Sequence, residues 1–380
     1  MEKVKLGDVC KVQGGYAFKS KEFQKDSIPI IRIGNIQDNE VEIDYNVCFT
    51  KEFLNKHPEF EIKYGDILIA MSGATVGKIG KYQNDTKALL NQRVGNFIVT
   101  EKLEKRYLYF LLQSPLFEKF ILNNAFGCAQ PNISSKQIEE FEFYNYDNVE
   151  QIEIANQLDK VQEIIDFRKK QIQELDELIK SQFIEMFGNI NSYKRLEEYS
   201  ILITKGASPK WQGIDYKNEG TLFITSENVR EGYIDISKPK YLDDKINEIL
   251  PRSVLKRDDI LINIVGASIG RAAKYDYDYL ANINQAVALV RTKNVNNIYL
   301  LQYLNSEQAI KMYTDMKKGG ARENLSLKNI SDLKIPDAPI ELQNKFAEVV
   351  KQIDKQKFEI QKSLEETQKL QESLMNKYFG

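Results

Sequence analysis

Polar side chains that can form two hydrogen bonds at once occur at matching places in the two halves of the chain. Asn91, Gln92 and Arg93 are consecutive, and Asn284 and Gln285 repeat the first two of them 193 positions later. Asn and Gln amides suit adenine and the Arg guanidinium suits guanine, so these residues could read bases in a DNA groove. Buried structural hydrogen bonding is an equally good interpretation of the Asn–Gln pairs.

Two glycine-rich turns end on a basic residue. Gly73 and Gly77 precede Lys78, and Arg271 ends the equivalent turn of the second half. A cation in this place can hold a DNA phosphate. The turn does not match a nucleotide-binding P-loop, because its glycine spacing is one residue short and Ile79 stands where Ser or Thr would bind magnesium.

The residue types needed for catalysis are scarce. His57 is the only histidine, which argues against Ser-His-Asp, Cys-His and histidine-based metal sites. Glu61 and Lys63 form a fragment of a nuclease motif, but no acidic residue pairs with them as a metal site requires. No methyltransferase tetrapeptide occurs. The three cysteines lack metal-ligand spacing and indicate free thiols in a reducing cytoplasm. We predict no catalytic residue, metal or cofactor in this chain.

Two further pairs of segments are candidates for contact with DNA. Residues 127–134 parallel residues 319–326, and Ser134 is typical of a helix cap, so this segment either caps a helix or contacts DNA. Residues 14–19 and 206–211 occupy equivalent places but differ in sequence. Such unrepeated tracts are better suited to reading different bases than the repeated residues are.

These observations predict a DNA-binding surface in each half. Trp211, the only tryptophan, lies either in a core or on this surface. The predicted DNA-binding residues are Tyr16, Lys19, Arg32, Asn35, Thr75, Lys78, Gln92, Arg93, Gln130 and Asn132 in the first half, and Lys210, Trp211, Ser226, Asn228, Ser268, Arg271, Gln285, Arg322 and Asn324 in the second.

The matching residues belong to an internal duplication. Asp66 and Asp259 are 193 positions apart, and near the ends of the halves the offset is 192, as between Phe187 and Phe379. The period is far too long for a solenoid repeat, and there are only two copies. Each copy has the size of a domain plus an appendage.

Composition is compatible with two domains. The chain has 380 residues, 42% of them hydrophobic, which suffices for two cores. We expect a cytoplasmic protein, because no run of about 18 apolar residues predicts a membrane span and the start lacks a signal-peptide apolar region. The net charge of −2 does not indicate a nucleic-acid binder by itself. A nearly neutral total still permits one basic face, because acidic stretches such as residues 173–177 can balance its charge.

Each half opens with short, β-rich apolar runs such as residues 66–71 and 260–265. Runs of this length bounded by Gly, Asn and Asp are typical of buried strands, and short helices are expected after them. The fold class is therefore α+β. The predicted domains are residues 1–149 and residues 189–340.

Each half closes with a long helical segment, residues 150–188 and 341–380. Apolar residues alternate at spacings of three and four, which predicts two long helices that pair with each other. Arg168 and Lys357 interrupt the apolar seam. A helix lying against its own domain is the alternative. The predicted seam residues are Leu158, Val161, Ile165, Ile172, Leu175, Ile179, Phe346, Val350, Ile353, Ile360 and Leu364.

The doubled order of these features resembles the specificity (S) subunit of type I restriction-modification enzymes. The resemblance covers the whole chain. Each motif is weak alone, but their order, repeated and followed each time by a long helix, is specific. The motifs that carry it are residues 4–9, 65–68, 72–77 and 130–134 in the first half, and residues 259–262, 324–330 and 333–336 in the second.

The resemblance implies two target-recognition domains, each reading one half of a bipartite, asymmetric site on double-stranded DNA. It also implies that the two conserved helices form an intramolecular antiparallel coiled coil, set the gap between the half-sites and dock two modification (M) subunits. The M subunits would bring S-adenosylmethionine and methylate adenine. Restriction (R) subunits would add translocation and cleavage driven by ATP, with Mg. The chain itself would be non-catalytic.

The sequence departs from the family pattern in two places. A Pro-rich turn usually precedes each helix; residues 336–341 keep it, whereas residues 144–149 do not, so the first joint is expected to be shaped differently. Residues 322–323 also differ from residues 130–131 of the first copy. Two other functions stay open: a scaffold that joins proteins without reading DNA, and a self-contained DNA methyltransferase or nuclease.

Overall fold

The computed structural model describes residues 2–37, 39–125, 131–317 and 324–380. It divides into two compact units, of which unit 1 is Met1–Lys169 with Lys362–Gly380 and unit 2 is Lys170–Gln361. Each unit thus holds one globular domain, one end of each long helix and its own core. This division differs from the four segments predicted from the sequence, because the helix ends pack into the domain cores.

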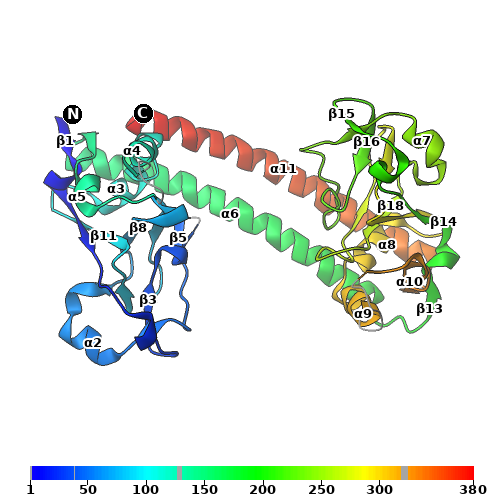
Figure 1. Ribbon diagram of the computed structural model, residues 1–380, viewed down its shortest axis with the longest axis horizontal. Helices are drawn as coiled ribbons and strands as arrows, with labels where there is room; N and C mark the ends of the chain where they lie inside the picture. Colours follow the sequence, from blue (N-terminus) through cyan, green and yellow to red (C-terminus); the bar gives the residue numbers. More distant parts are fainter. Residues whose placement is uncertain (1, 38, 126–130, 318–323) are drawn as a thin grey trace. The chain divides into compact units, whose positions relative to one another are not determined.

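The domain of unit 1 is a mixed α+β body (Figure 1). Its strands are β1 (Glu2–Lys5), β2 (Cys10–Gly14), β3 (Ile28–Ile31), β4 (Ile36–Gln37), β5 (Asn39–Val41), β6 (Cys48–Phe49), β7 (Glu61–Ile62), β8 (Ile67–Ala70), β9 (Ile79–Lys81), β10 (Ala88–Leu90), β11 (Val94–Val99) and β12 (Glu142–Asn145). Its helices are α1 (Leu6–Val9), α2 (Lys51–Lys56), α3 (Lys105–Leu111), α4 (Pro115–Ala125) and α5 (Ser135–Glu139). A six-stranded sheet has the order β2-β11-β8-β9-β5-β4, a four-stranded sheet has the order β6-β3-β10-β7, and β1 pairs with β12.

The domain of unit 2 repeats this plan. Its strands are β13 (Tyr193–Arg195), β14 (Ser200–Lys205), β15 (Tyr216–Lys217), β16 (Thr221–Ile224), β17 (Tyr241–Leu242), β18 (Ile260–Asn263), β19 (Ala272–Lys274), β20 (Ala281–Ile283), β21 (Val287–Thr292) and β22 (Lys334–Pro336). Its helices are α7 (Ile246–Ile249), α8 (Asn297–Leu304), α9 (Glu307–Lys317) and α10 (Leu327–Ser331). The sheets have the orders β14-β21-β18-β19, β15-β17-β16-β20 and β13-β22.

The two domains match strand for strand at their centres. The order β2-β11-β8-β9 in unit 1 corresponds to β14-β21-β18-β19 in unit 2. In both units a short parallel pair lies in the second sheet, β3 with β10 and β16 with β20. The predicted α+β class and the internal duplication are confirmed.

A repeated aspartate holds the start of the central strand in each unit. The Asp66 carboxylate accepts a hydrogen bond from the backbone N–H of Lys63 (2.9 Å), and the Asp259 carboxylate does the same with Lys256 (2.7 Å). Strands β8 and β18, which follow these turns, are buried along their whole length. The repeated aspartate therefore shapes the turn that delivers an apolar strand to the core.

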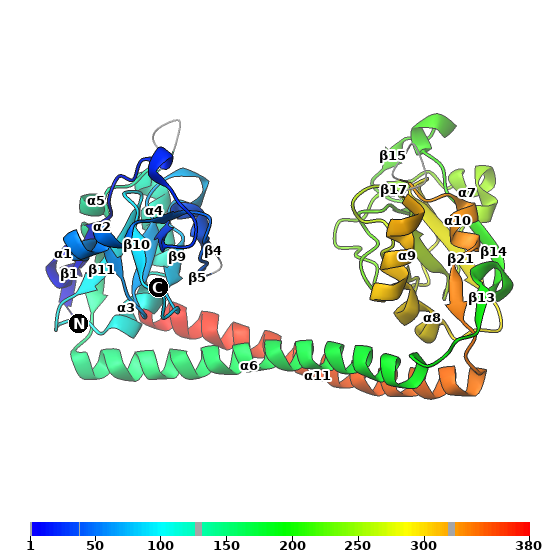
Figure 2. The same cartoon turned by 90° about the horizontal axis from the view of Figure 1, so that it is seen from below.

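The long helices are α6 (Asn148–Phe187) and α11 (Ile340–Phe379), each 40 residues long (Figure 2). In unit 1 the Tyr378 hydroxyl donates to Gln157 Oε1 (2.8 Å), and Arg168 Nη1 donates to Thr367 Oγ1 (3.0 Å). Later residues of α6 thus contact earlier residues of α11, so the two helices are antiparallel there. Within the described residues, no helix is long and apolar enough to cross a membrane.

The predicted seam residues are buried or half-buried, and polar residues interrupt them. In unit 2 the interrupting cation Lys357 pairs with Asp176, at 2.5 Å between Nζ and Oδ1. In unit 1 Arg168 contacts Ser363 and Thr367. The buried seam residues are Leu158, Val161, Ile165, Ile179, Phe346, Val350, Ile353 and Leu364, and the half-buried ones are Ile172, Leu175 and Ile360.

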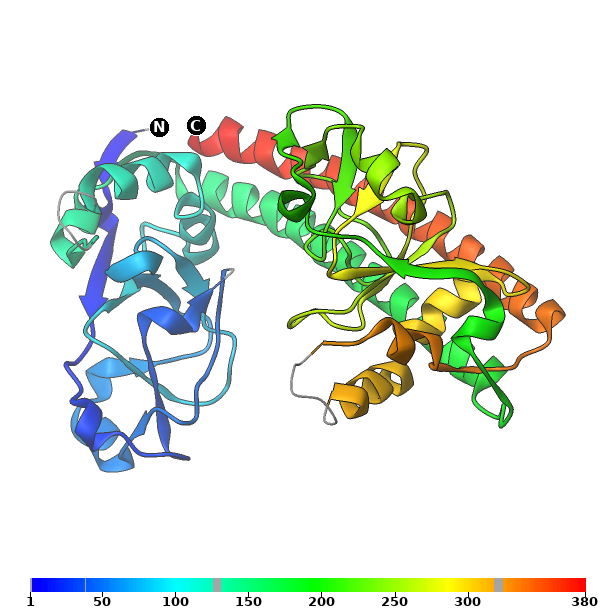
Figure 3. The ribbon, with the colours of Figure 1, turned by 45° about the vertical axis from the view of Figure 1, so that its right-hand side comes forward.

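Each domain core is completed by the last turns of one long helix. Figure 3 shows the ribbons of the two helices. At the end of α11, Phe379 is 4% exposed and its ring lies 5.2 Å from that of Tyr107 on α3. At the end of α6, Phe187 is 3% exposed and its ring lies 4.6 Å from that of Tyr299 on α8. Each helix end is therefore part of the globular core rather than a free spacer.

We expect Phe379→Ala to destabilise unit 1 and Phe187→Ala to destabilise unit 2. Removing a buried Phe leaves a cavity and costs about 3–5 kcal/mol. The measurement is denaturant unfolding of the full chain. The control is Phe167→Ala on α6, where the side chain is 61% exposed and the change should stay within about 0.5 kcal/mol. Equal effects of the buried and exposed substitutions would contradict this account of the helix ends.

Candidate nucleic-acid interface

The repeated glycine turn presents a basic side chain at the surface in both units. Gly77 and Gly270 have φ values of +85° and +90°, which favour glycine. A Cβ atom would lie 2.6 Å from a side chain of α4 at Gly77 and 2.4 Å from a side chain of α9 at Gly270. The turn is therefore pressed onto a helix, and the exposed Lys78 and Arg271 follow it directly.

The repeated asparagine of each Asn–Gln pair has a structural role. Asn91 Oδ1 accepts a hydrogen bond from the backbone N–H of Arg93 (3.2 Å), and Asn284 Oδ1 accepts one from the N–H two residues later (3.0 Å). This leaves the next residues free to point outward. Gln92, Arg93 and Gln285 are exposed and could form the paired hydrogen bonds predicted for base reading.

The structure corrects the prediction for Asn35 and Asn228. Both are 8% exposed. Asn35 Oδ1 accepts from the backbone N–H of Arg32 (2.9 Å), and Asn228 Oδ1 accepts from the N–H of Thr225 (2.9 Å). Because these side chains are buried and already hydrogen-bonded, they shape their loops and present no group to DNA.

Two more predicted contacts in unit 1 are half-buried. Arg32 Nη2 lies 3.5 Å from Asp44 Oδ2, and the Thr75 hydroxyl donates to a backbone carbonyl 3.4 Å away. Both interactions are long, so neither side chain is held firmly. Arg32 and Thr75 therefore stay predicted contacts with DNA.

In unit 2 a buried asparagine that the sequence reasoning missed connects two predicted contacts. Asn263, at the end of β18, is fully buried. Its Nδ2 lies 3.0 Å from the carbonyl oxygen of Ser226 and 3.1 Å from Ser268 Oγ. Ser226 and Ser268 are half-buried and act mainly as partners of Asn263. The sequence does contain a sign of this role. Asn263 is the single polar residue of the apolar strand β18, and the equivalent residue of the first half is Ala70.

The unrepeated tracts present different side chains in the two units. Tyr16, 40% exposed, packs in unit 1 against an aromatic cluster that includes Phe53 and His57, with ring centroids 4.8 Å and 6.1 Å away. In unit 2 the short helix Pro209–Gln212 carries Trp211, which is 85% exposed. The alternative that Trp211 lies in a core is therefore wrong. Lys19 and Lys210 are exposed.

The capping interpretation of the next segment is confirmed. Ser134 and Ser326 are the N-cap residues of α5 and α10, and each side chain accepts a hydrogen bond from the first turn. Asn132 and Asn324, two residues earlier, are exposed. The predicted contacts that lie outside the described residues are Gln130 and Arg322.

Backbone hydrogen bonds bring the candidate loops together within each unit. In unit 1 the Gln92 N–H donates to the Tyr16 carbonyl and the Gly73 N–H to that of Pro131, each at 2.9 Å. In unit 2 the Ile264 N–H donates to the Ala286 carbonyl, and the Leu325 N–H donates to the Ile264 carbonyl, each at 2.9 Å. These two bonds join the segments around residues 264, 286 and 325. We use the name loop surface for the exposed residues Tyr16, Lys19, Lys78, Gln92, Arg93 and Asn132 of unit 1, and Lys210, Trp211, Arg271, Gln285 and Asn324 of unit 2.

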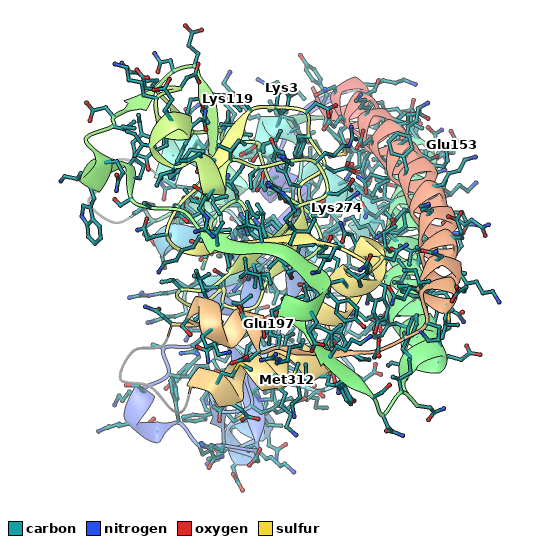
Figure 4. All side chains as sticks on the ribbon, turned by 90° about the vertical axis from the view of Figure 1, so that its right-hand side faces the viewer. Lys3, Lys119, Glu153, Glu197, Lys274 and Met312 are labelled. Carbon is teal, nitrogen blue, oxygen red and sulfur yellow. The ribbon has the colours of Figure 1, made fainter. Side chains whose placement is uncertain are left out.

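Several cations elsewhere are neutralised by neighbours. Two of them, Lys3 and Lys274, are labelled in Figure 4. Lys3 Nζ lies 2.6 Å from Glu142 Oε2, and Lys274 Nζ lies 3.2 Å from Asp258 Oδ1. Within the described part of the chain, by contrast, Lys78 and Arg271 form no ion pair. These two side chains are therefore available to an anion such as a DNA phosphate.

The described side chains form no candidate metal site and their cysteines are buried. Over the described residues, no group of three or more His, Cys, Asp or Glu side chains is arranged to hold a metal ion. Cys10 and Cys48 are free and buried. Burial raises the pKa of the Cys10 thiol to about 12, so it stays protonated and unreactive near neutral pH.

Comparison with known proteins identifies the family. The family model for the type I restriction modification DNA specificity domain matches residues 1–177 and 196–371, one match in each repeat. The chain belongs to this family. The two matches coincide with the two copies of the duplication.

One relative and a solved structure resemble the chain over nearly all of its length, and another relative resembles about half of it. It is 25% identical to the type I restriction enzyme EcoBI specificity subunit of Escherichia coli, over 99% of this chain and 85% of that protein. It is 30% identical to the MjaVIII specificity subunit of Methanocaldococcus jannaschii over 180 residues, 46% of this chain and 42% of that protein. The fold matches a type I restriction-modification S subunit from M. genitalium, with a TM-score of 0.58, 16% identity and coverage of 100% of this chain and 96% of that chain.

The single tryptophan offers a direct test of the unit 2 loop surface. Trp211 is 85% exposed, so we expect its fluorescence to have the long-wavelength emission of a solvated indole and to be quenched strongly by acrylamide. Trp211→Phe should abolish the signal without changing the unfolding transition, since an exposed side chain contributes little to stability. A short-wavelength emission that acrylamide quenches poorly would place the indole in a core and contradict the structure.

Proposed function

We propose that the chain is the DNA sequence-specificity subunit of a type I restriction-modification enzyme, in which each loop surface reads one half of a bipartite, asymmetric site on double-stranded DNA. The observation that carries the proposal is the duplicated domain. In each copy repeated residues such as Asn91 and Asn284 build the loops, and some exposed positions carry different side chains, such as Tyr16 in unit 1 and Trp211 in unit 2. Two similar frames with different side chains suit a target with two different halves.

The loop surface offers both kinds of contact that such reading requires. Gln92 and Gln285 can pair with adenine, and Arg93 can pair with guanine, through two hydrogen bonds each. Lys78 and Arg271 can hold phosphates, which fixes the register of each domain on the duplex. Trp211 adds an exposed aromatic face. The differences between the two surfaces would then set the difference between the two half-sites.

The long helices are proposed to dock two M subunits, because they expose apolar side chains that the chain does not cover. In unit 1 Phe167 is 61% exposed and Ile164, three residues earlier and so on the same helix face, is 43% exposed. In unit 2 Phe358 is 67% exposed. Clustered exposed apolar groups are typical of protein interfaces.

The chemistry of the complex is assigned to the partners. The family is one of specificity subunits, and we propose that S-adenosylmethionine and adenine methylation belong to the M subunits, and that ATP, Mg and cleavage belong to the R subunits. This chain would contribute recognition and assembly. A scaffold without DNA readout and a self-contained methyltransferase or nuclease are both disfavoured by the family to which the chain belongs.

The experiment that tests the function is a genome-wide map of methylated adenine in cells with the gene intact and deleted. We expect a two-part motif with a fixed gap to lose methylation on deletion and to regain it when the intact gene is supplied. A deletion that leaves every methylated motif unchanged, in cells shown to express the M subunit, would refute the proposal.

We expect Lys78→Ala and Arg271→Ala to weaken DNA binding of the assembled complex by similar factors on target and non-target duplexes. Loss of one phosphate contact should reduce the slope of log affinity against log salt by about 1. The matched control is Lys169→Ala, an exposed lysine of α6 outside the loop surface. Fluorescence anisotropy over a salt series gives the slopes. An unchanged slope would remove these residues from the phosphate contacts.

A further inference from the structure

A buried glutamine occupies the same position at the start of each long helix. Gln151 on α6 is 0% exposed and Gln343 on α11 is 1% exposed. They are 192 positions apart, the offset that relates the ends of the two repeats. A fully buried glutamine is unusual, because its amide must find partners for an acceptor and two donors.

The two glutamines make the same two hydrogen bonds to equivalent residues. Gln151 Oε1 accepts from the backbone N–H of Glu104 (2.7 Å), and its Nε2 donates to the carbonyl of Tyr146 (2.8 Å). The equivalent bonds of Gln343 are from the N–H of Asn296 (2.9 Å) and to the carbonyl of Ala338 (2.8 Å). Both partner pairs are themselves 192 positions apart.

Each glutamine therefore ties three elements together. Glu104 and Asn296 are the N-cap residues of α3 and α8. Tyr146 and Ala338 lie in the turns that lead into α6 and α11. One side chain in the first turn of each long helix thus fixes that helix both to the turn before it and to a helix of the globular domain.

A tyrosine reinforces the same joint in each unit. The Tyr299 hydroxyl donates to the Pro336 carbonyl (2.7 Å), and the Tyr107 hydroxyl lies 3.5 Å from the Tyr144 carbonyl. The rings of these tyrosines also contact the buried helix ends, Phe187 and Phe379 respectively. The joint thus locks the start of one long helix and the end of the other to the domain.

The glutamine bonds are kept although the surrounding turn differs. Asp147 caps α6, with its carboxylate accepting from the Glu150 N–H (2.8 Å), whereas Pro339 occupies the equivalent place before α11. The departure from the Pro-rich turn thus changes the cap but keeps the two shared glutamine bonds. The first joint is also shaped differently at the glutamine itself, because Gln151 Nε2 lies 3.2 Å from the Lys102 carbonyl and 3.1 Å from Asn145 Oδ1 as well.

We propose that Gln151 and Gln343 are positioning residues that fix the angle between each recognition domain and its helix and so restrict the gap that the subunit accepts between half-sites. This inference rests on the proposed function. One extra base pair moves a half-site by about 3.4 Å and turns it by about 35° around the DNA axis. A joint held by buried hydrogen bonds resists such a change, whereas a loosened joint accommodates it.

The test uses the full chain with its M partner and maps methylated adenine at genomic sites with the native gap and with gaps one base pair longer or shorter. Gln151→Met and Gln343→Met keep the bulk of the side chain and remove its hydrogen bonds. We expect discrimination against the altered gaps to fall by about tenfold, the scale expected for losing buried hydrogen bonds, with both half-site sequences unchanged. The matched control is Gln352→Ala, an exposed glutamine of α11.

The outcomes separate this inference from the proposed function. If the unaltered chain yields no bipartite motif, the proposed function fails. If it yields one and both glutamine variants keep the native gap, or lose half-site selectivity instead, only the positioning role is overturned. If the glutamine variants do not fold, Tyr299→Phe loosens the same joint more mildly, and an unchanged gap distribution in that variant overturns the inference.

Discussion

The structure of each unit depends on the burial of a helix end in a domain core. Phe379 completes the core around Tyr107, and Phe187 completes the core around Tyr299. A core that lacked these rings would expose apolar surface of the sheet and of α3 or α8. Since the long helix is part of the core, the domain cannot tilt on the helix without breaking packed contacts. The positions of the loops that each domain carries are therefore fixed relative to the helices of its own unit.

The repeated asparagines have structural roles in the loops. The repeated Asn35 and Asn228 are buried, and the repeated Asn91 and Asn284 use their side-chain oxygens on the backbone. These residues reproduce one loop frame twice. Some exposed positions are repeated as well, such as Gln92 and Gln285, whereas others carry different groups, most clearly where unit 2 presents Trp211. Such an arrangement allows a duplicated domain to acquire a second specificity without losing its fold, because the changed positions contribute little to the core.

The sequence predicted the features that depend on local pattern. Apolar runs identified the central strands, the three–four spacing identified the helices and their seam, and the offset of the motifs identified the duplication. It did not predict which polar residues are buried. The burial of Asn35 and Asn228 and the bonds of Gln151 and Gln343 depend on segments distant in sequence, such as the Glu104 N–H that Gln151 meets 47 residues away. The exposure of Trp211 could not be read from its type either, since tryptophan suits both cores and contact surfaces.

The nearly neutral net charge of the chain is compatible with DNA binding when ion pairs between surface side chains are taken into account. The net charge is −2, and several surface cations face a carboxylate, as Lys3 and Lys274 do. Such pairs add little to the potential at a distance. Lys78 and Arg271 lack such a partner within the described residues, so their charges would stay available to a phosphate. A weakly charged chain with local cations would depend on its bound partners for the remaining attraction to DNA, which suits a subunit that should act only in the assembled complex.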